Sequence, residues 1–329
     1  MSTAWVVGAS KDSEQRMRAD LHVDTLWRLE EKGGGLTPFR DDLQIDAKRC
    51  LEGDVRLLCT AIFTEDQRKD PWEHCCRLLD VKDRISDDPG EPFRSVTTPA
   101  ELADLDQGVT GMLATIENAR CLEGDLSRLD ELHHRGVRML GLTWNGQNEL
   151  GQGVLADQHQ GLTTFGKAVV EKAAQMGWAI DISHLNHEGV VDVCESGAPV
   201  IATHSNARTI HDHPRNLSDE ILRHLAEVDG MVGVNIFPPF LAPPEETATL
   251  ATVVRHVIHL MEFLGKGHVA LGTDLDGISN TARGFRDHRD LDALANALDG
   301  GGLESQVVSS VLGDGFLHWW SNWSAPLES

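Results

Sequence analysis

Eight short apolar runs rich in β-branched residues recur along this chain, and their repetition limits the possible folds more than any other feature. Each run ends in polar residues and is followed by a stretch with the spacing of an amphipathic helix. Near-continuous apolar strands that alternate with helices are typical of a parallel sheet covered on both faces. The expected strands are residues 21–26, 55–63, 110–117, 137–144, 178–185, 199–205, 230–237 and 268–277.

Eight strands alternating with helices predict a (β/α)8 barrel, an α/β fold of the TIM type. The competing fold is a doubly wound open sheet, which needs a glycine-rich phosphate turn directly after its first strand. The glycines of "WRLEEKGGGL" stand too far along the chain for that turn. With no low-complexity linker and no internal repeat, we treat residues 1–329 as one catalytic domain. Expected helices include residues 125–136, 163–177, 218–230 and 249–267.

The chain is strongly acidic, with a net charge of −23 from 29 Lys and Arg against 52 Asp and Glu. Such a surface repels nucleic acids and anionic membranes, which bind through clusters of Lys and Arg. The apolar stretch 4–7 is too short for a signal peptide, and no run approaches a membrane span. Six cysteines without a CxxC pair fit a reduced, cytoplasmic protein. We therefore expect a small-molecule partner and no nucleic-acid or membrane partner, and we leave a homodimer open.

Two successive apolar runs lead directly into a histidine, in "AIDISHL" (His184) and "PVIATHS" (His204). One such residue has an ordinary explanation as a hydrogen-bonded core histidine. In a (β/α)8 barrel, however, catalytic groups stand at the carboxyl ends of the strands, and these two positions are strand ends. The two histidines therefore direct attention to the other strand ends.

Most of the expected strands end in a histidine, aspartate or glutamate, which are side chains that can bind a metal ion. His22 and Asp24 are two residues apart, and so on the same face of the first strand. Imidazoles and carboxylates in this proportion suit Zn²⁺, and five ligands exceed the needs of one catalytic zinc. Two Zn²⁺ ions bridged by Glu117 would use all of them. The predicted metal ligands are His22, Asp24, Glu117, His184 and His204, and the last strand is expected to end in Asp274, with Asp276 just beyond it.

Other histidines carry weaker signals. The pairs His133/His134 and His256/His259 are expected on solvated helix faces. The loop "HDHPRN" places two histidines and Arg215 just after the run 199–205, where a cation could meet an anionic substrate group. An ordinary surface turn explains this loop equally well, so both readings stay open.

With these residues in place, the chain resembles the membrane dipeptidase (renal dipeptidase) family, the zinc peptidases of family M19. The resemblance covers nearly the whole chain, and the matching stretches follow the family's order. It implies a barrel of the metal-dependent hydrolase superfamily that hydrolyses dipeptides, including some with a D-residue at the C-terminal position. The stretches are "DLHVDTLW", "TIENARCLEGD", "GVRMLGLTWN", "DISHL", "PVIATHSNAR", "HPRNLSDE", "HVALGTDLDG" and "GDGFLHWW".

The resemblance also implies roles for single residues. His22 and Asp24 would hold the first zinc, His184 and His204 the second, and Glu117 would bridge them. Two Zn²⁺ ions lower the pKa of a bridging water from about 15.7 toward 7, which supplies a hydroxide. Asp274 would be the catalytic acid and base, beside the catalytic bridge Glu117. Arg215 would bind the substrate's C-terminal carboxylate, and Asn235 is a further substrate-binding candidate.

Trp144 marks a departure from the family pattern. Many members carry a histidine after the threonine of the fourth strand, whereas this chain has Trp144 in "LTWNGQNELG". An indole can donate one N–H hydrogen bond but, unlike an imidazole, it cannot take up a proton and become positively charged. We expect Trp144 to act as an aromatic wall that binds the substrate side chain.

Two rival functions compete with a dipeptidase. An amidohydrolase-type barrel could act on an N-acyl amino acid, a lactone or a phosphoester. Many such enzymes use H-x-H on the first strand and a carboxylated lysine on the fourth, where this chain has H-x-D and Trp144. A metal-binding scaffold without activity would not need Asp274, which the scheme does not use as a ligand. Both observations favour the dipeptidase.

Overall fold

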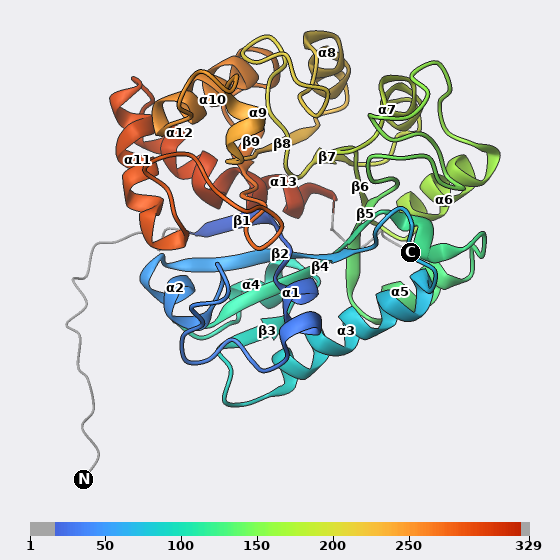
Figure 1. Cartoon of the computed structure of the whole chain (residues 1–329), viewed down its shortest axis with the longest axis horizontal. Helices are drawn as coiled ribbons and strands as arrows, with labels where there is room; N and C mark the ends of the chain where they lie inside the picture. The colour runs from blue at the N-terminus through green and yellow to red at the C-terminus, as the bar shows by residue number, and fades with distance from the viewer. Residues whose placement is uncertain (1–16, 324–329) are drawn as a thin grey trace.

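The computed structural model describes residues 17–323 and contains one nine-stranded sheet. The strand order is β1-β2-β4-β5-β6-β7-β8-β9, every neighbouring pair is parallel, and β3 adds to the side of β4. Figure 1 shows these strands curving around a common centre. The strands are β1 (Arg18–Val23), β2 (Val55–Phe63), β3 (Phe93–Ser95), β4 (Thr110–Glu117), β5 (Val137–Gly141), β6 (Ala179–Asp181), β7 (Val200–Ala202), β8 (Met231–Val234) and β9 (Val269–Leu271).

The first strand and the segment after the last strand meet and nearly close the barrel. Val23 forms a parallel bridge with Leu275. The Asp24 N–H donates to the Leu275 carbonyl at 2.9 Å, and the Asp274 N–H donates to the His22 carbonyl at 2.9 Å. Eight parallel strands with interleaved helices confirm the predicted (β/α)8 fold.

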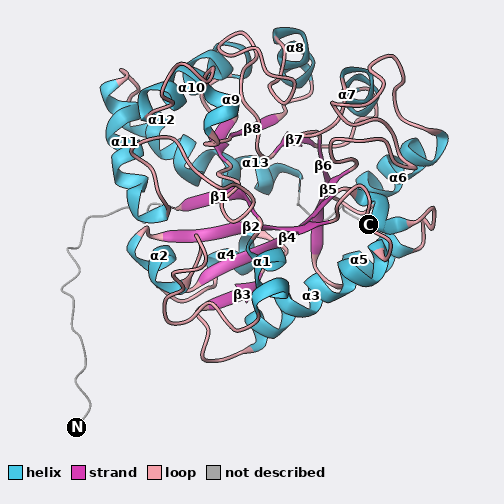
Figure 2. Cartoon of the chain, in the orientation of Figure 1, coloured by secondary structure: helices cyan, strands magenta, loops and turns pink. Residues whose placement is uncertain are grey.

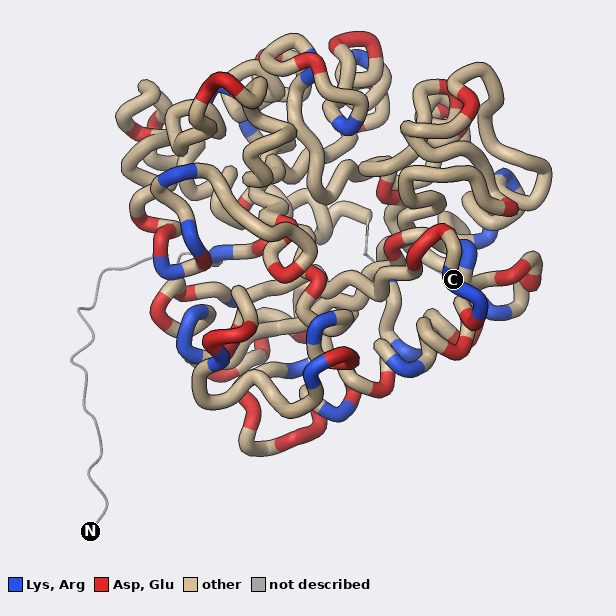
Figure 3. The backbone as a smooth tube through the Cα atoms, viewed as in Figure 1, with Lys and Arg blue, Asp and Glu red and all other residues tan. Residues whose placement is uncertain are grey.

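Helices surround the strands on the outside, as Figure 2 shows by colour. Lys and Arg are scattered among Asp and Glu along these outer segments (Figure 3). Within residues 17–323, none of the helices has the length and apolar character needed to cross a membrane. The helices are α1 (Thr25–Lys32), α2 (Ala47–Glu52), α3 (Pro71–Asp87), α4 (Pro99–Ala103), α5 (Arg128–His134), α6 (Thr164–Gln175), α7 (His187–Cys194), α8 (Asp219–Glu227), α9 (Pro238–Leu241), α10 (Leu250–Leu264), α11 (Leu291–Gly300), α12 (Ser305–Ser309) and α13 (Gly315–Trp323), with the short turns η1 (Ala119–Leu122), η2 (His288–Asp290) and η3 (Ser310–Asp314).

Two buried apolar clusters hold the barrel together. The larger cluster packs outward-facing strand residues such as Ile116 and Val232 against the surrounding helices. The smaller one gathers inward-facing residues such as Leu113 and Met139 with Trp320 of α13. Alternate residues of a strand point to opposite faces, so each strand contributes to both clusters.

The first strand begins earlier than predicted. β1 covers Arg18–Val23 instead of residues 21–26, and the chain enters helix α1 at Thr25. The pairing of β1 with β2 is irregular between Asp20 and Val23. Leu21 accordingly belongs to the inner cluster and Val23 to the outer one, although residues two apart in a regular strand share a face. The prediction that His22 and Asp24 share one strand face is therefore wrong, because Asp24 lies beyond the strand at the start of α1.

Several later strands are shorter than predicted. His184, His204 and Asp274 were expected at strand ends, but they lie in the loops just after β6, β7 and β9. At the end of β6, one oxygen of Asp181 accepts the backbone N–H groups of Ser183 and Thr203, both at 3.0 Å. Because the Asp181 side chain accepts these backbone N–H groups, they do not form strand-to-strand hydrogen bonds, and the strand ends there. The apolar sequence pattern therefore continues past the true end of the strand.

The structure also corrects the prediction for His256 and adds a strand. His256 is fully buried in α10 rather than on a solvated face. Its Nδ1 accepts the Ala207 N–H at 3.1 Å, and its Nε2 lies 3.0 Å from the Leu241 carbonyl. It is a hydrogen-bonded core histidine. The three-residue strand β3 was not predicted, because so short a segment carries no clear period.

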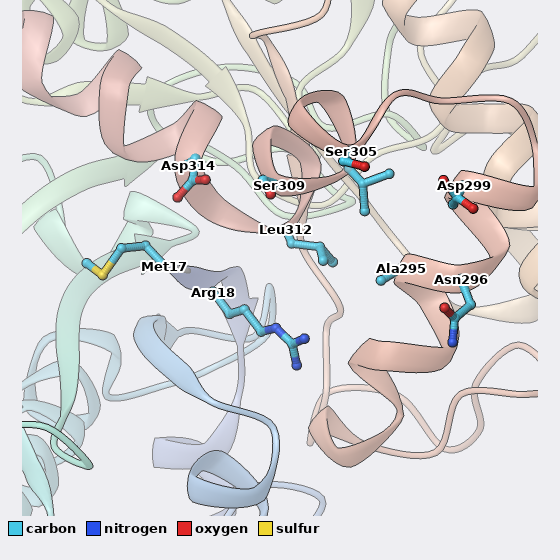
Figure 4. A pocket seen from close by; sticks show the side chains of 10 residues that line it. Met17, Arg18, Ala295, Asn296, Asp299, Ser305, Ser309, Leu312 and Asp314 are labelled. Atoms are coloured by element: carbon cyan, nitrogen blue, oxygen red, sulfur yellow. The ribbon is translucent and has the colours of Figure 1, made fainter. Parts of the chain in front are cut away.

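A cavity of about 190 Å³ lies at the start of β1, at the opposite end of the strand from His22. Figure 4 shows Met17 and Arg18 facing residues of α11 and η3 across it. Arg18 pairs with Asp292 and donates to the Gly53 carbonyl at 2.9 Å. The guanidinium therefore joins the start of the barrel to the helices that follow its last strand.

Candidate metal centre

The five predicted ligands converge at the carboxyl end of the barrel. They come from segments that are far apart in the sequence, and parallel strands bring the ends of these segments to one edge. All five are at least nine-tenths buried. The contributing positions are the end of β1 (His22), the start of α1 (Asp24), the end of β4 (Glu117), the loop after β6 (His184) and the loop after β7 (His204).

The first half of the centre contains His22, Asp24 and Glu117, whose ligand atoms lie within 4.8 Å of one another. The Nε2 atom of His22 is 3.3 Å from Glu117 Oε2 and 3.7 Å from Asp24 Oδ2. One imidazole nitrogen and two carboxylates form a compact set of donors for a divalent cation.

The second half contains Glu117, His184 and His204, again with ligand atoms within 4.8 Å. The other oxygen of Glu117, Oε1, is 3.1 Å from His184 Nε2 and 3.9 Å from His204 Nε2. The two Nε2 atoms are 2.9 Å apart. Glu117 thus presents one oxygen to each half, which is the geometry of a bridging carboxylate.

The donor atoms fit a pair of cations. Within residues 17–323, His22 Nε2 and Asp24 Oδ1 are buried without a hydrogen-bond partner. Burial of an unpaired polar atom is costly, and a metal ion would satisfy both. A set of imidazole and carboxylate donors with no thiolate suits Zn²⁺ or a similar divalent ion.

The two halves differ in charge. Burial alone would lower the pKa of His22, but the negative charges of Glu117 and Asp24 raise it well above its ordinary value. In the second half, burial and the charge of Arg215 lower the pKa of His184 to about 4. Burial and the neighbouring His22 lower the pKa of His204 well below its ordinary value. Burial would raise the pKa of Glu117, but His22 and His184 lower it strongly.

Asp274 lies beside the first half, in the loop after β9. Burial and the negative charge of Asp24 raise the pKa of Asp274 well above its ordinary value. Its backbone is in the left-handed region, with φ of 65°, which is uncommon for a residue other than glycine. A Cβ at Gly277 would lie 2.5 Å from Asp274 Oδ1 and 2.1 Å from Asp24 Oδ2. A side chain at position 277 would therefore displace at least one of these two carboxylates from its observed position.

Two other residues named from the sequence are Asn235 and Asp276. Asn235 is fully buried, and its Nδ2 donates to Asp274 Oδ2 at 3.0 Å. It contacts the carboxylate rather than the cavity, so a direct substrate contact stays a prediction. Asp276 accepts from Thr25 Oγ1 at 2.7 Å and from the Gln44 N–H at 2.7 Å. Both of its oxygens are used to hold loops together.

Arg215 lies beside the second half. Its NH2 group donates to His184 Nε2 at 3.1 Å, and its NH1 group donates to the Ser183 carbonyl. Its Nε is buried without a hydrogen-bond partner in the described part of the chain. Burial lowers the pKa of Arg215 to about 10, so the side chain stays charged at neutral pH.

A cavity of about 650 Å³ opens over the two halves, and Asp24, Glu117, His184, His204, Arg215 and Asp274 all line it. One part of its wall is aromatic. The ring of Trp144 packs edge-on against Phe63 at 5.3 Å between centroids, and Phe63 packs edge-on against Trp27 at 6.0 Å. Trp144 is also 6.1 Å from the ring of His184. The predicted aromatic wall is in the cavity, and contact with a substrate stays a prediction.

Of the loop "HDHPRN", Arg215 and His213 line the cavity, and His211 does not. His213 Nδ1 accepts the Arg215 backbone N–H at 3.1 Å. The His213 ring packs on the ring of Phe240, with the two centroids 4.7 Å apart. The loop is therefore more than a surface turn, because it positions Arg215.

Three polar residues behind the ligands were not predicted. Asn145 Oδ1 is 3.0 Å from His184 Nδ1, and Thr203 contacts two ligand rings. Asp181 accepts from Thr203 and Ser183. Small polar residues inside an apolar run carry no spacing signal, and only their position next to a ligand histidine could have indicated them.

A parallel barrel that gathers two groups of candidate metal ligands around a shared carboxylate at its carboxyl end has the arrangement found in metal-dependent hydrolases. Residues 12–325 match the model of the membrane dipeptidase family, peptidase family M19, and the chain belongs to this family. A protein from the pqqA 5′ region of Klebsiella pneumoniae is 34% identical over 231 residues, which cover 67% of this chain and 82% of that protein.

Two solved structures of metallopeptidases have the same architecture. A family M19 metallopeptidase, dipeptidase AC, is 26% identical with a TM-score of 0.88, over 95% of this chain and 100% of that one. A metallopeptidase from Rhodobacter sphaeroides, liganded with a phosphinate mimic of the dipeptide L-Ala-D-Ala, is 25% identical with a TM-score of 0.86. The match covers 93% of this chain and 99% of that one.

Proposed function

We propose that this chain is a dipeptidase that holds two Zn²⁺ ions and hydrolyses dipeptides, including those with a D-residue at the C-terminal position. The observation that carries the proposal is the shared carboxylate of Glu117 between two ligand groups, with Asp274 beside one and Arg215 beside the other. The dipeptide mimic bound by the Rhodobacter sphaeroides relative supports the substrate class and its stereochemistry.

Two side chains place the substrate. Arg215 would bind the C-terminal carboxylate, because a planar guanidinium can donate to both oxygens and its Nε has no partner in the described residues. The aromatic wall of Trp144, Phe63 and Trp27 would bind an apolar side chain. The peptide bond would then lie over Glu117.

Asp274 would move the proton. Divalent cations held by the five ligands would polarise the scissile carbonyl and would lower the pKa of a water toward neutrality. The Asp274 carboxylate would accept the proton of the attacking water and deliver it to the departing amine. Asn235 keeps this carboxylate in place by donating to Oδ2 at 3.0 Å. The raised pKa of Asp274 fits a group that must hold a proton between the two transfers.

A substrate panel tests this function. The Zn²⁺-loaded protein is assayed against dipeptides with L- and D-residues at the C-terminal position, and against N-acetyl amino acids, lactones and phosphoesters. We expect turnover of dipeptides, loss of that turnover with a chelator and recovery with added Zn²⁺. Turnover of the N-acyl, lactone or phosphoester compounds without dipeptide hydrolysis would identify an amidohydrolase of another kind.

A further inference from the structure

The hydroxyl of Thr203 lies between ligands of the two halves of the metal centre. Thr203 follows β7 and is fully buried. Its Oγ1 is 3.2 Å from Nδ1 of His22 and 2.9 Å from Nδ1 of His204. It also donates to Asp181 Oδ2. One hydroxyl thus contacts an imidazole of the first half and an imidazole of the second half.

The hydrogen-bonding capacity of these groups assigns the direction of each bond. Asp181 Oδ1 accepts from the Ser183 N–H at 3.0 Å, the Ser183 hydroxyl at 2.6 Å and the Thr203 N–H at 3.0 Å, so this carboxylate acts as an acceptor. The single hydrogen of the Thr203 hydroxyl is donated to Asp181 Oδ2. Two lone pairs remain on Oγ1, and only donors can use them. The Ser183 hydroxyl also lies 3.3 Å from Oγ1, but its hydrogen is donated to Asp181 Oδ1 at the shorter distance of 2.6 Å.

The two imidazoles must therefore each donate Nδ1–H to Thr203. An imidazole that carries its hydrogen on Nδ1 presents a lone pair on Nε2 when it is neutral. The Nε2 atoms of His22 and His204 both face Glu117, at 3.3 Å and 3.9 Å. The rings lie close together, with centroids 3.8 Å apart and planes at 38°. A change in the hydroxyl would disturb both rings at once.

We propose that Thr203, anchored by Asp181, is a positioning residue that sets the tautomer and orientation of one metal ligand in each half of the centre. This inference rests on the proposed metal site and adds that the two halves are coupled through one hydroxyl behind the ligands. Partners of ligand histidines on the far side from the metal fix the ring and its basicity. The usual arrangement gives each histidine its own partner, whereas here two histidines share one.

The chain contains a matched control and an independent third ligand. Thr273 donates from Oγ1 to Asp20 Oδ2, just as Thr203 donates to Asp181. Its other contact is the backbone N–H of Leu275 at 3.2 Å, not an imidazole. The third ligand ring, His184, contacts Asn145 through Nδ1 at 3.0 Å, so its own hydrogen-bond partner behind the metal centre is not Thr203.

The test compares Thr203→Val, Thr203→Ser and Thr273→Val, with Zn²⁺ as the probe. Stoichiometry is measured by elemental analysis, and affinity by competition with a chromophoric chelator. We expect Thr203→Val to weaken both sites by about 10- to 100-fold, the usual effect of removing such a partner. Thr203→Ser should bind within a few-fold of the wild type, and Thr273→Val should do the same even where its unfolding temperature falls. Wild-type affinity at either site in Thr203→Val would overturn the proposal.

A measurement on the wild-type protein keeps the proposal testable if Thr203→Val does not fold. In the Zn²⁺-loaded protein, ¹⁵N shifts of the histidine side chains should show Nδ1–H and metal-bound Nε2 for both His22 and His204. An Nε2–H in either ring would overturn the assignment. These measurements report metal content and the protonation of ring nitrogens, not activity. An inactive wild-type protein in the dipeptide panel would therefore refute the proposed function, whereas the role of Thr203 would be decided by the metal and NMR measurements alone.

Discussion

The two halves of the metal centre share Glu117, but their surroundings carry opposite charge. His22 is surrounded by the carboxylates of Asp24 and Glu117, with Asp274 nearby. His184 and His204 have the guanidinium of Arg215 as their neighbour. An acidic half that attracts cations and protons thus adjoins a half suited to an anionic substrate group. In the proposed function, Glu117 would join a half that handles protons to a half that binds the substrate carboxylate.

This asymmetry orients the proposed substrate. If Arg215 binds the C-terminal carboxylate, the dipeptide approaches with that end over the second half and its peptide bond toward the first. Asp274 then lies on the side where a proton must be received and delivered. Breaking one half at a time should therefore produce different defects, except at Glu117.

Glu117→Gln should give the largest effect, because a bridge serves both halves. We expect both metals to be lost and kcat/KM to fall by roughly 10³-fold or more, since the cations supply several kcal/mol of transition-state stabilisation. Elemental analysis measures the occupancy. Glu65→Gln is the control, because Glu65 lines the same cavity and pairs with Arg68 rather than with a ligand. Loss of only one metal would make Glu117 a ligand of one half alone.

Asp274→Asn should disable the acidic half without emptying it. Metal content should be unchanged, while kcat falls by roughly 10²-fold or more, the usual contribution of a positioned acid and base. Steady-state kinetics with parallel metal analysis separate the two properties. A kcat near that of the wild type would assign the proton transfer to another group.

Arg215→Met should affect the other half. A lost charge-assisted hydrogen bond is worth about 1.5–3 kcal/mol, so KM for free dipeptides should rise by roughly 10- to 100-fold. Dipeptides with an amidated C-terminus serve as the control, and their KM should change much less. Equal penalties for both substrates would show that Arg215 does not bind the carboxylate.

Trp144→Ala should change the substrate profile and leave the metals in place. Loss of the aromatic wall should lower kcat/KM by roughly tenfold for dipeptides with bulky apolar side chains, and least for glycine-containing ones. Trp144→His should reorder the preference. An equal loss for every dipeptide would place the indole in catalysis or in barrel packing.

The smallest expected effect is a difference in pH dependence between the halves. The raised pKa of His22 means that its proton is retained above the usual range and must leave when a cation binds, so affinity at the first half should rise with pH around neutrality. The pKa of His184 is about 4, so affinity at the second half should change little above about pH 5. Stepwise Zn²⁺ titrations from pH 6 to 8 measure both. The same slope for both steps would remove the proposed asymmetry.

The sequence predicts the barrel and the gathering of these residues better than it predicts the local backbone. Apolar runs indicate which residues follow a strand, and parallel strands bring their carboxyl ends together, which is why His184 and His204 are found near Glu117. The same runs continue into the loops, so the strand ends were placed too late. His22 and Asp24 lie close together as the sequence indicates, but they do not share a strand face, since the chain bends between them into α1.

The periodicity of apolar residues cannot predict the hydrogen bonds that hold the ligand side chains from behind. Thr203 and Asp181 are a small polar residue and an acid within apolar runs, and nothing in their spacing shows that a hydroxyl will meet two imidazoles. Arg215 was recognised as a cation in a loop, but its contact with His184 depends on how two loops fold over the barrel. Such pairings follow from tertiary geometry rather than from local sequence.

The seam that nearly closes the barrel has a consequence for the order in which the protein is made. There the Asp274 N–H donates to the His22 carbonyl, and the Asp24 N–H donates to the Leu275 carbonyl. A nascent chain emerges from the ribosome with its first strand early and its last strand late, and domains are completed as units during synthesis. This seam therefore cannot form before residue 275 has been synthesised, although His22, Asp24 and Glu117 are all translated long before.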